Sequence, residues 1–186
     1  MRNYHIFCFL LALVVFQISC KSDNTKSNKS SQTSAEKLIE EGYTIIPDSG
    51  ISPDMIEMWN KSALNILEHR IKEDDESYAI IEDKVWEYQF IHSGGEMSKP
   101  GQFAGHWLDF LDDNTYEYGI GKDIKGGGRY HYSPMTTLLL MVDNNQSIKP
   151  REHKLSIAGD IFVFSGSGVY KDNGTQGKLV RIAQRP

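Results

Sequence analysis

The chain has 186 residues, and its 25 acidic side chains outnumber its 20 basic ones, which gives a formal net charge of −5 at neutral pH. This acidic balance argues against a protein that binds nucleic acid and against a basic surface that binds membranes. The part that could fold, about 150 residues, suits one domain with one hydrophobic core.

The first 19 residues have the pattern of a signal peptide. Arg2 supplies a positive charge, and residues 6–18 form an almost unbroken apolar run that is too short to span a bilayer. Ser19 and Cys20 follow, and this segment resembles the lipobox of bacterial lipoproteins, in the Ser-Cys form of Bacteroidetes-type bacteria. The resemblance implies that residues 1–19 are removed and that Cys20 carries acyl chains, palmitate among them, which anchor the protein to a membrane. The alternative is a plain secretory signal that leaves Cys20 unmodified.

Cysteine usage favours the lipid anchor. The only other cysteine, Cys8, is removed with the signal peptide, so the mature chain can form no internal disulfide. A lone exposed thiol would be a liability in an oxidising compartment. Residues 21–34 lack aromatic and branched aliphatic side chains, so we interpret residues 20–34 as the lipidated cysteine and a flexible tether. Lys21 replaces the Asp that retains many lipoproteins in the inner membrane, which predicts the outer membrane, on its periplasmic or its surface face.

Two helices are predicted next. Thr33 and Glu36 have the spacing of a capping box, which predicts a short helix over residues 34–41. The run Ser52-Pro53-Asp54 is a strong start signal for a second helix, with Ser52 as the N-cap and Pro53 at the first helical position. Apolar side chains then recur at helical spacing on one stripe, which comprises Ile56, Trp59, Ala63, Ile66, Leu67 and Ile71. We therefore expect residues 35–76 to form a helical segment that packs on the remaining domain.

From residue 77 onward, short alternating segments replace the helical period. We expect eight strands, near residues 85–92, 105–111, 115–120, 128–132, 137–143, 152–157, 160–165 and 179–184, and a short additional strand over 78–81. Turn-forming pairs such as Asn144-Asn145 and Asn173-Gly174 separate them, as in hairpins. The pattern predicts a mainly β domain over residues 77–186. An antiparallel up-and-down barrel of about eight strands is favoured because closure removes the exposed edges.

Particular segments of this domain resemble a known family. The run GHWLDFLDDNTYEYG is similar to the strand–turn–strand unit of lipocalin-like (calycin-type) bacterial domains, and GGGRYHY followed by TTLLLMVD resembles their next hairpin. Trp86 lies on the first expected strand, in KVWEYQF, and Arg181 lies on the last. In lipocalins a Trp on the first strand packs beneath an Arg of the last, so the resemblance implies this structural role for Trp86 and Arg181. An avidin-like barrel and an open sandwich are the alternative architectures.

Aromatic side chains on the strands are the candidate ligand-binding groups. An eight-stranded barrel has an interior just wide enough for its own side chains or one small ligand. Tyrosines combine a ring with a polar tip, which suits a pocket that stacks a ring or a sugar and also offers hydrogen bonds. The candidates are Trp86, Tyr88, Trp107, Tyr116, Tyr118, Tyr130 and Tyr132. The alternative is ordinary packing of the barrel interior by cross-strand aromatic pairs.

Catalytic and metal-binding patterns are weak. The histidines are scattered, and no cysteine is available to join them in a metal site. Ser165-Gly166-Ser167-Gly168 lacks the first glycine of a nucleophile elbow, and no helix follows it. Gly126-Gly127-Gly128 opens an expected strand rather than a helix, so it predicts a tight turn or a bulge instead of a phosphate cradle.

The sequence as a whole predicts a lipoprotein that is not an enzyme and uses no cofactor or metal. Its expected partners are the membrane, through the lipid, and a small hydrophobic or aromatic ligand in the barrel. The alternative is a lipoprotein with a packed barrel that interacts with, or inhibits, another protein of the cell envelope. An open or a packed interior discriminates between these two functions. The identity of the ligand and the oligomeric state are not predicted.

Overall fold

The computed structural model describes residues 50–73 and 79–186. The predicted signal peptide, the lipidated Cys20, the tether and the predicted helix over residues 34–41 lie outside the described residues. In the part that is described, no helix has both the length and the apolar character needed to cross a bilayer.

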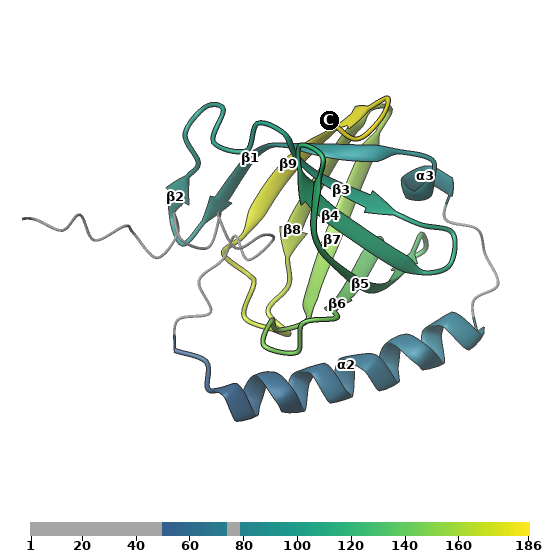
Figure 1. Cartoon of the computed structure of the whole chain (residues 1–186). Coiled ribbons are helices and arrows are strands. Elements are labelled where there is room, and N and C mark those ends of the chain that lie inside the picture. The colour runs from purple at the N-terminus through teal and green to yellow at the C-terminus, as the bar shows by residue number, and fades with distance from the viewer. Residues whose placement is uncertain (1–49, 74–78) are drawn as a thin grey trace, which may run out of the picture. The chain divides into compact units, whose positions relative to one another are not determined.

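Eight antiparallel strands form a closed barrel, as the sequence predicted (Figure 1). They are β1 (Val85–Ser93), β3 (His106–Phe110), β4 (Thr115–Ile120), β5 (Asp123–Ser133), β6 (Leu138–Asp143), β7 (Arg151–Ala158), β8 (Ile161–Gly166) and β9 (Gln176–Ile182). Each strand pairs with the next along the chain, and β1 pairs with β9 to complete the ring. The connections are therefore those of an up-and-down meander.

Two elements differ from the sequence prediction. A two-residue strand, β2 (Glu96–Met97), extends the sheet beside the end of β1 and was not predicted. The expected strand over residues 78–81 is wrong, because residues 79–82 form the short helix α3 (Ala79–Glu82). Ile81 of this helix is buried in the barrel core, and its carbonyl oxygen accepts a hydrogen bond of 3.0 Å from Nε1 of Trp86. A short apolar run cannot be assigned to helix or strand by its period alone.

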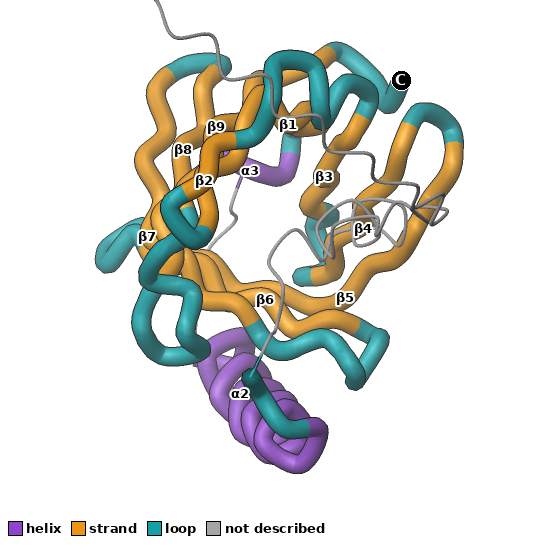
Figure 2. Tube along the Cα trace, turned by 90° about the vertical axis from the view of Figure 1, so that its left-hand side faces the viewer, coloured by secondary structure: helices purple, strands orange, loops and turns teal. Residues whose placement is uncertain are grey.

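The long helix α2 (Pro53–Glu73) begins where the sequence predicted. The backbone nitrogen of Ile56 donates to the carbonyl oxygen of Ser52 at 3.1 Å, which makes Ser52 the N-cap. Figure 2 shows this helix outside the ring of strands, beside β5 and β6. Its apolar stripe packs against outward-facing side chains of β6 and the β8–β9 loop; this outer cluster comprises Ala63, Leu67, Leu140, Val142 and Tyr170, with Trp59, Leu64 and Ile71 at its border. Ile66 was expected on this stripe, but 39% of its surface is exposed, so it does not belong to the buried face.

Aromatic rings fill the barrel at the end where α3 lies. Trp86 and Phe162 have ring centroids 5.2 Å apart, and Phe110 and Tyr130 meet edge to face at 4.9 Å. All four side chains are at most 1% exposed. This end of the interior is therefore packed, and space for a ligand has to be sought at the other end.

Asn60 connects helix α2 to the loop between β6 and β7. It is fully buried, and its Nδ2 donates to the carbonyl oxygens of Gln146 at 2.9 Å and Ile148 at 3.0 Å. We predict that Asn60→Ala lowers the free energy of unfolding by roughly 2–4 kcal/mol, because two carbonyl groups lose their donor. The matched variant Asn65→Ala, on the exposed side of the same helix, should cost less than about 0.5 kcal/mol. Urea unfolding of both variants measures the difference, and equal losses would contradict the assigned role of Asn60.

Candidate functional site

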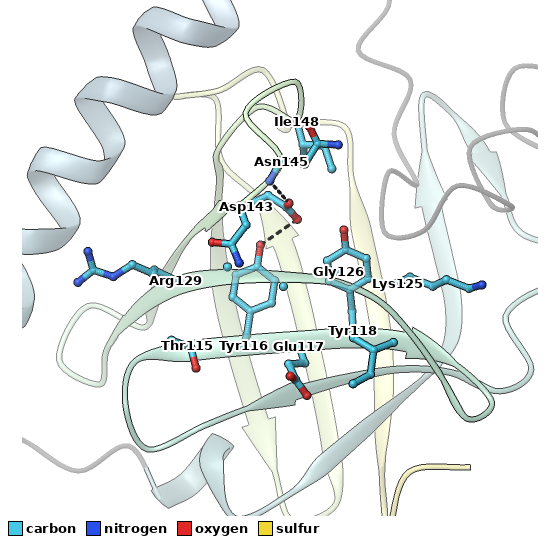
Figure 3. Close-up of a pocket in the computed structure, with 14 residues that line it drawn as sticks. Thr115, Tyr116, Glu117, Tyr118, Lys125, Gly126, Arg129, Asp143, Asn145 and Ile148 are labelled. Atoms are coloured by element: carbon cyan, nitrogen blue, oxygen red, sulfur yellow. Dashed lines mark hydrogen bonds between the residues drawn. The ribbon is translucent and has the colours of Figure 1, made fainter.

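Polar side chains gather at the barrel end opposite α3, which we call the polar end. It is formed by the β4–β5 hairpin, the β6–β7 loop (residues 144–150) and the β8–β9 loop (residues 167–175). A pocket of about 860 Å³ lies on the β4–β5 side of this end (Figure 3). Its lining comprises Thr115, Tyr116, Glu117, Tyr118, Ile124, Lys125, Gly126, Gly127, Gly128, Arg129, Asp143, Asn144, Asn145 and Ile148.

The three consecutive glycines make room for the tyrosines of β4. A Cβ atom on Gly126 would lie 2.2 Å from the hydroxyl oxygen of Tyr118, and one on Gly128 would lie 2.9 Å from a ring carbon of Tyr116. The glycines therefore let both tyrosine rings lie directly against the backbone of β5. The predicted bulge is also present, since the β4–β5 register shifts by one residue beside Gly126.

Asp143 is the buried acid of the pocket. Its carboxylate accepts hydrogen bonds from the Tyr116 hydroxyl at 3.4 Å and from the backbone nitrogen of Asn145 at 2.7 Å. Burial raises the pKa of Asp143, whereas the Asn145 amide, the two tyrosine hydroxyls and the charge of Arg151 act to lower it. The Tyr116 and Tyr118 rings are stacked with centroids 6.2 Å apart. The Asp143 carboxylate therefore lies beside two stacked tyrosine rings.

A buried ionic cluster joins the β6–β7 loop to the β8–β9 loop at the polar end. The Lys149 ammonium lies 2.6 Å from Oδ1 of Asp172 and donates to the carbonyl oxygen of Tyr170 at 2.6 Å. The Arg151 guanidinium lies 3.7 Å from the same carboxylate oxygen, and all three charged side chains are at most 4% exposed. Charges are removed from water at high cost, so a buried cluster of this kind holds only while every member has its partner.

His153 points into the barrel beside this cluster. It is 2% exposed, its ring centroid lies 4.6 Å from that of Phe164, and neither ring nitrogen has a hydrogen-bond partner among the described residues. Burial, together with the charges of Arg151 and Lys149, lowers the pKa of His153 to about 3. The imidazole is therefore neutral at physiological pH.

The structure brings together only some of the predicted ligand-binding residues. All six inward-facing candidates belong to the core cluster. Two of them, Tyr116 and Tyr118, also line the pocket, whereas Trp86, Tyr88, Tyr130 and Tyr132 do not. Trp107 is on the outer face of β3, because Leu108 and Phe110 occupy the inner face. The C-terminal Arg185 covers it, with its guanidinium 4.6 Å from the ring centroid and 2.6 Å from Asp109. The assignment of Trp107 to a ligand site inside the barrel is therefore wrong.

The expected packing of Arg181 over Trp86 is also wrong. The two residues are partners in the β1–β9 register, but the Arg181 side chain is 45% exposed and lies 3.5 Å from Asp160. Among the described residues, the cation over the Trp86 ring is the Lys84 ammonium, 5.8 Å from its centroid. Arg181 comes one residue before the end of β9, where its side chain can leave the barrel for solvent.

Sequence reasoning missed most of the polar groups at this end. The alternation along β6 could have indicated Asp143, because Leu139 and Met141 point inward and residue 143 follows in the same phase. Lys149 and Asp172 lie in separate loops, and the sequence carries no signal that these loops meet. Within residues 50–73 and 79–186, no cluster of three or more histidine, cysteine or acidic side chains is suited to hold a metal ion.

Comparisons with known proteins do not identify a family for this chain. No protein-family model matches the sequence, and a search of curated proteins finds no match. Among solved structures, the chain is similar to a DUF4847 family protein from Bacteroides vulgatus ATCC 8482, with a TM-score of 0.42 and 10% identity. The likeness covers 56% of this chain and 96% of that one. A similarity of this size carries no argument about function, so the proposals below rest on the residues themselves.

The ionic cluster predicts a large loss of stability when its acid is removed. Asp172→Ala leaves two buried cations without their shared carboxylate, and it should lower the free energy of unfolding by about 3–5 kcal/mol. Asp160→Ala is the matched control, because Asp160 also pairs with an arginine but is 72% exposed. The control should cost less than about 1 kcal/mol. Urea unfolding followed by tryptophan fluorescence compares the two, and a small loss for both would contradict the cluster.

The buried His153 predicts that stability falls in acid. Its pKa is about 3 in the folded chain against an ordinary value of 6.5, so between these values the unfolded chain binds more protons. Because of His153, the free energy of unfolding should therefore fall by roughly 1.4 kcal/mol for each unit by which the pH drops below about 6.5. Asp143 acts in the opposite sense, because burial raises its pKa from 3.8.

The contribution of His153 is isolated by comparing His153→Phe with the unchanged protein. Denaturant titrations across this acidic range should show a clearly shallower loss of stability in the variant. His69→Phe, on the exposed side of α2, serves as the control for replacing a histidine by phenylalanine elsewhere in the chain. Identical slopes for His153→Phe and the unchanged protein would contradict a buried neutral imidazole.

Proposed function

We propose that this chain is a membrane-anchored lipoprotein of the outer membrane whose lipocalin-like barrel binds a small, partly apolar ligand without catalysing a reaction. The observation that carries the proposal is the pocket of about 860 Å³ at the polar end of the barrel. This volume lies within the range of about 300–1,000 Å³ that is typical of small-molecule sites. Two tyrosine rings and two isoleucines supply apolar surface, and Asp143 with two asparagines supplies hydrogen-bonding groups.

The distribution of packing in the barrel supports a ligand at this end. Trp86, Phe110, Tyr130 and Phe162 fill the α3 end without leaving surface exposed. The polar end has the pocket and the buried titratable groups, and such groups gather at functional sites in many proteins. The alternative function, an interaction or inhibitor protein with a fully packed barrel, has less support because the barrel leaves this volume free.

The membrane anchor is supported by the sequence alone. The signal peptide ends directly before Cys20, and a polar segment separates this cysteine from the folded domain. Two or three acyl chains on one cysteine provide stable anchoring, whereas a single chain binds only marginally. A binding domain held in this way would stay attached to the membrane.

The lipid anchor is tested by replacing the modified cysteine. Cys20→Ser should abolish labelling by a palmitate analogue and move the protein from the membrane to the soluble fraction of expressing cells. Cys8→Ser is the matched control and should leave labelling and fractionation unchanged, because residues 1–19 are removed. Membrane association of Cys20→Ser equal to that of the control would defeat the proposed anchor.

The ligand pocket is tested with anilinonaphthalene sulfonate and a fragment library as probes. Tyr118→Ala should weaken the binding of pocket-bound probes by about tenfold or more, because it removes one aromatic wall of the site. Tyr132→Ala is the matched control, since Tyr132 is also inward-facing and buried but does not line the pocket. Fluorescence titration and ligand-detected NMR measure affinity, and circular dichroism confirms that both variants fold. Probe binding that Tyr118→Ala leaves unchanged would contradict a ligand site at the polar end.

A further inference from the structure

Two acidic side chains lie opposite each other on the outer face of the barrel. Asp109 of β3 and Glu117 of β4 are partners in the β3–β4 register, and both alternate with side chains that face the core. Like charges directly opposite each other on neighbouring strands repel and destabilise a sheet. This arrangement therefore favours a cation that both carboxylates can share.

Arg185 supplies this cation. Its Nε and Nη2 donate to Oδ2 of Asp109 at 2.9 and 2.6 Å, and its Nη1 lies 2.7 Å from Oε2 of Glu117. The guanidinium carbon lies 4.6 Å from the centroid of the Trp107 ring, within the range of a cation–π contact. Two carboxylates and one aromatic face thus converge on a single guanidinium. A lysine ammonium lacks the planar fork of donors that this arrangement uses.

The walls of this site are held in place by the barrel and not by Arg185. Nε1 of Trp107 donates to the carbonyl oxygen of Gly121 at 2.9 Å. Gly119 lies opposite Trp107 in the register, and a Cβ atom on this glycine would lie 2.4 Å from the Trp107 ring, so the ring packs directly against the backbone of β4. The two acids stand on the paired strands themselves. The site therefore keeps its shape when the guanidinium leaves it.

The segment that carries Arg185 has few other attachments. Strand β9 ends at Ile182, and residues 183, 184 and 186 are exposed. Within the described part of the chain, the hydrogen bonds and ion pairs that hold residues 183–186 to the barrel are those of the Arg185 side chain. One side chain therefore decides whether this segment is bound to β3 and β4 or released.

We propose that the site formed by Trp107, Asp109 and Glu117 binds an arginine of a partner protein, and that Arg185 occupies it when the partner is absent. An arginine of the same chain is present at a high effective concentration, so a partner displaces it only by adding contacts beside the site. Arg185 thereby keeps isolated cations out of the site. The proposal concerns the outer face of β3 and β4 and does not rest on the binding of a small ligand in the pocket.

The site is tested with two peptides. One has the sequence of residues 183–186, N-acetyl-Ala-Gln-Arg-Pro-amide, and the other has lysine in place of its arginine. The site is vacant in the Arg185→Ala variant of the full chain, so the arginine peptide should shift the indole NMR signal of Trp107. It should bind at least about tenfold more tightly than the lysine peptide. No shift of this signal, or equal binding of the two peptides, would overturn the proposal.

Competition with Arg185 is measured in the unchanged protein. The arginine peptide should bind about tenfold or more weakly than to Arg185→Ala, because Arg185 holds the site. At saturation, the amide signals of Ala183 and Gln184 should move to the positions that they have in Arg185→Ala. Equal affinity for the two proteins would overturn the proposal, and so would peptide binding that leaves the signals of both residues in place.

Further variants, made in the Arg185→Ala background, place the peptide on the two acids. Asp109→Asn should weaken the arginine peptide by about tenfold or more, because Asp109 accepts two of the guanidinium hydrogen bonds. Asp160→Asn is the matched control, since Asp160 also pairs with an arginine but lies outside the site, and it should change the affinity by less than about twofold. Circular dichroism checks folding, and Glu117→Gln replaces Asp109→Asn if that variant is unfolded. Equal effects at the site and at Asp160 would overturn the proposal.

Discussion

Every assignment of inside and outside in this protein depends on the pairing between β1 and β9. The register runs from Val85 opposite Ile182 to His92 opposite Gln176, and it joins the first strand of the barrel to the last. Once the sheet is closed, alternate side chains of each strand must face a common interior. The inward-facing side chains form the aromatic core, whereas the outward-facing side chains of β6 pack against helix α2.

The two ends of the barrel differ in the kind of side chain that they bury. At the α3 end, close ring contacts exclude solvent and leave no room, as the burial of Trp86 and Phe110 shows. At the polar end, the Tyr118 side chain lies over Gly126, and two loops bury an ion pair between Lys149 and Asp172. Packing at the first end and polar contacts at the second stabilise the same barrel by different means. The pocket described above lies at the second of these ends.

The strands were predictable because their signal is local. Alternating side chains and turn residues mark each hairpin, and the start of helix α2 is encoded in Ser52-Pro53-Asp54. The site was less predictable, because its charged groups meet only through the fold. Lys149 and Asp172 are brought together by two loops, and Glu117 meets Arg185 across the outer face of the barrel. Trp107 and Arg181 were misjudged for a related reason, since the face and the end of a barrel that a residue reaches depend on register and strand length.

Helix α2 has a mechanical consequence that its packing alone does not reveal. The chain enters the described fold through this helix, and Asn60 in its second turn holds the loop that forms one wall of the pocket. A pulling force applied from the N-terminal side reaches α2 before it reaches any strand of the barrel. The first bonds to bear that load include the two between Asn60 and the β6–β7 loop. Tension on a surface-tethered copy would therefore act on the pocket wall while the strand ladders are still intact.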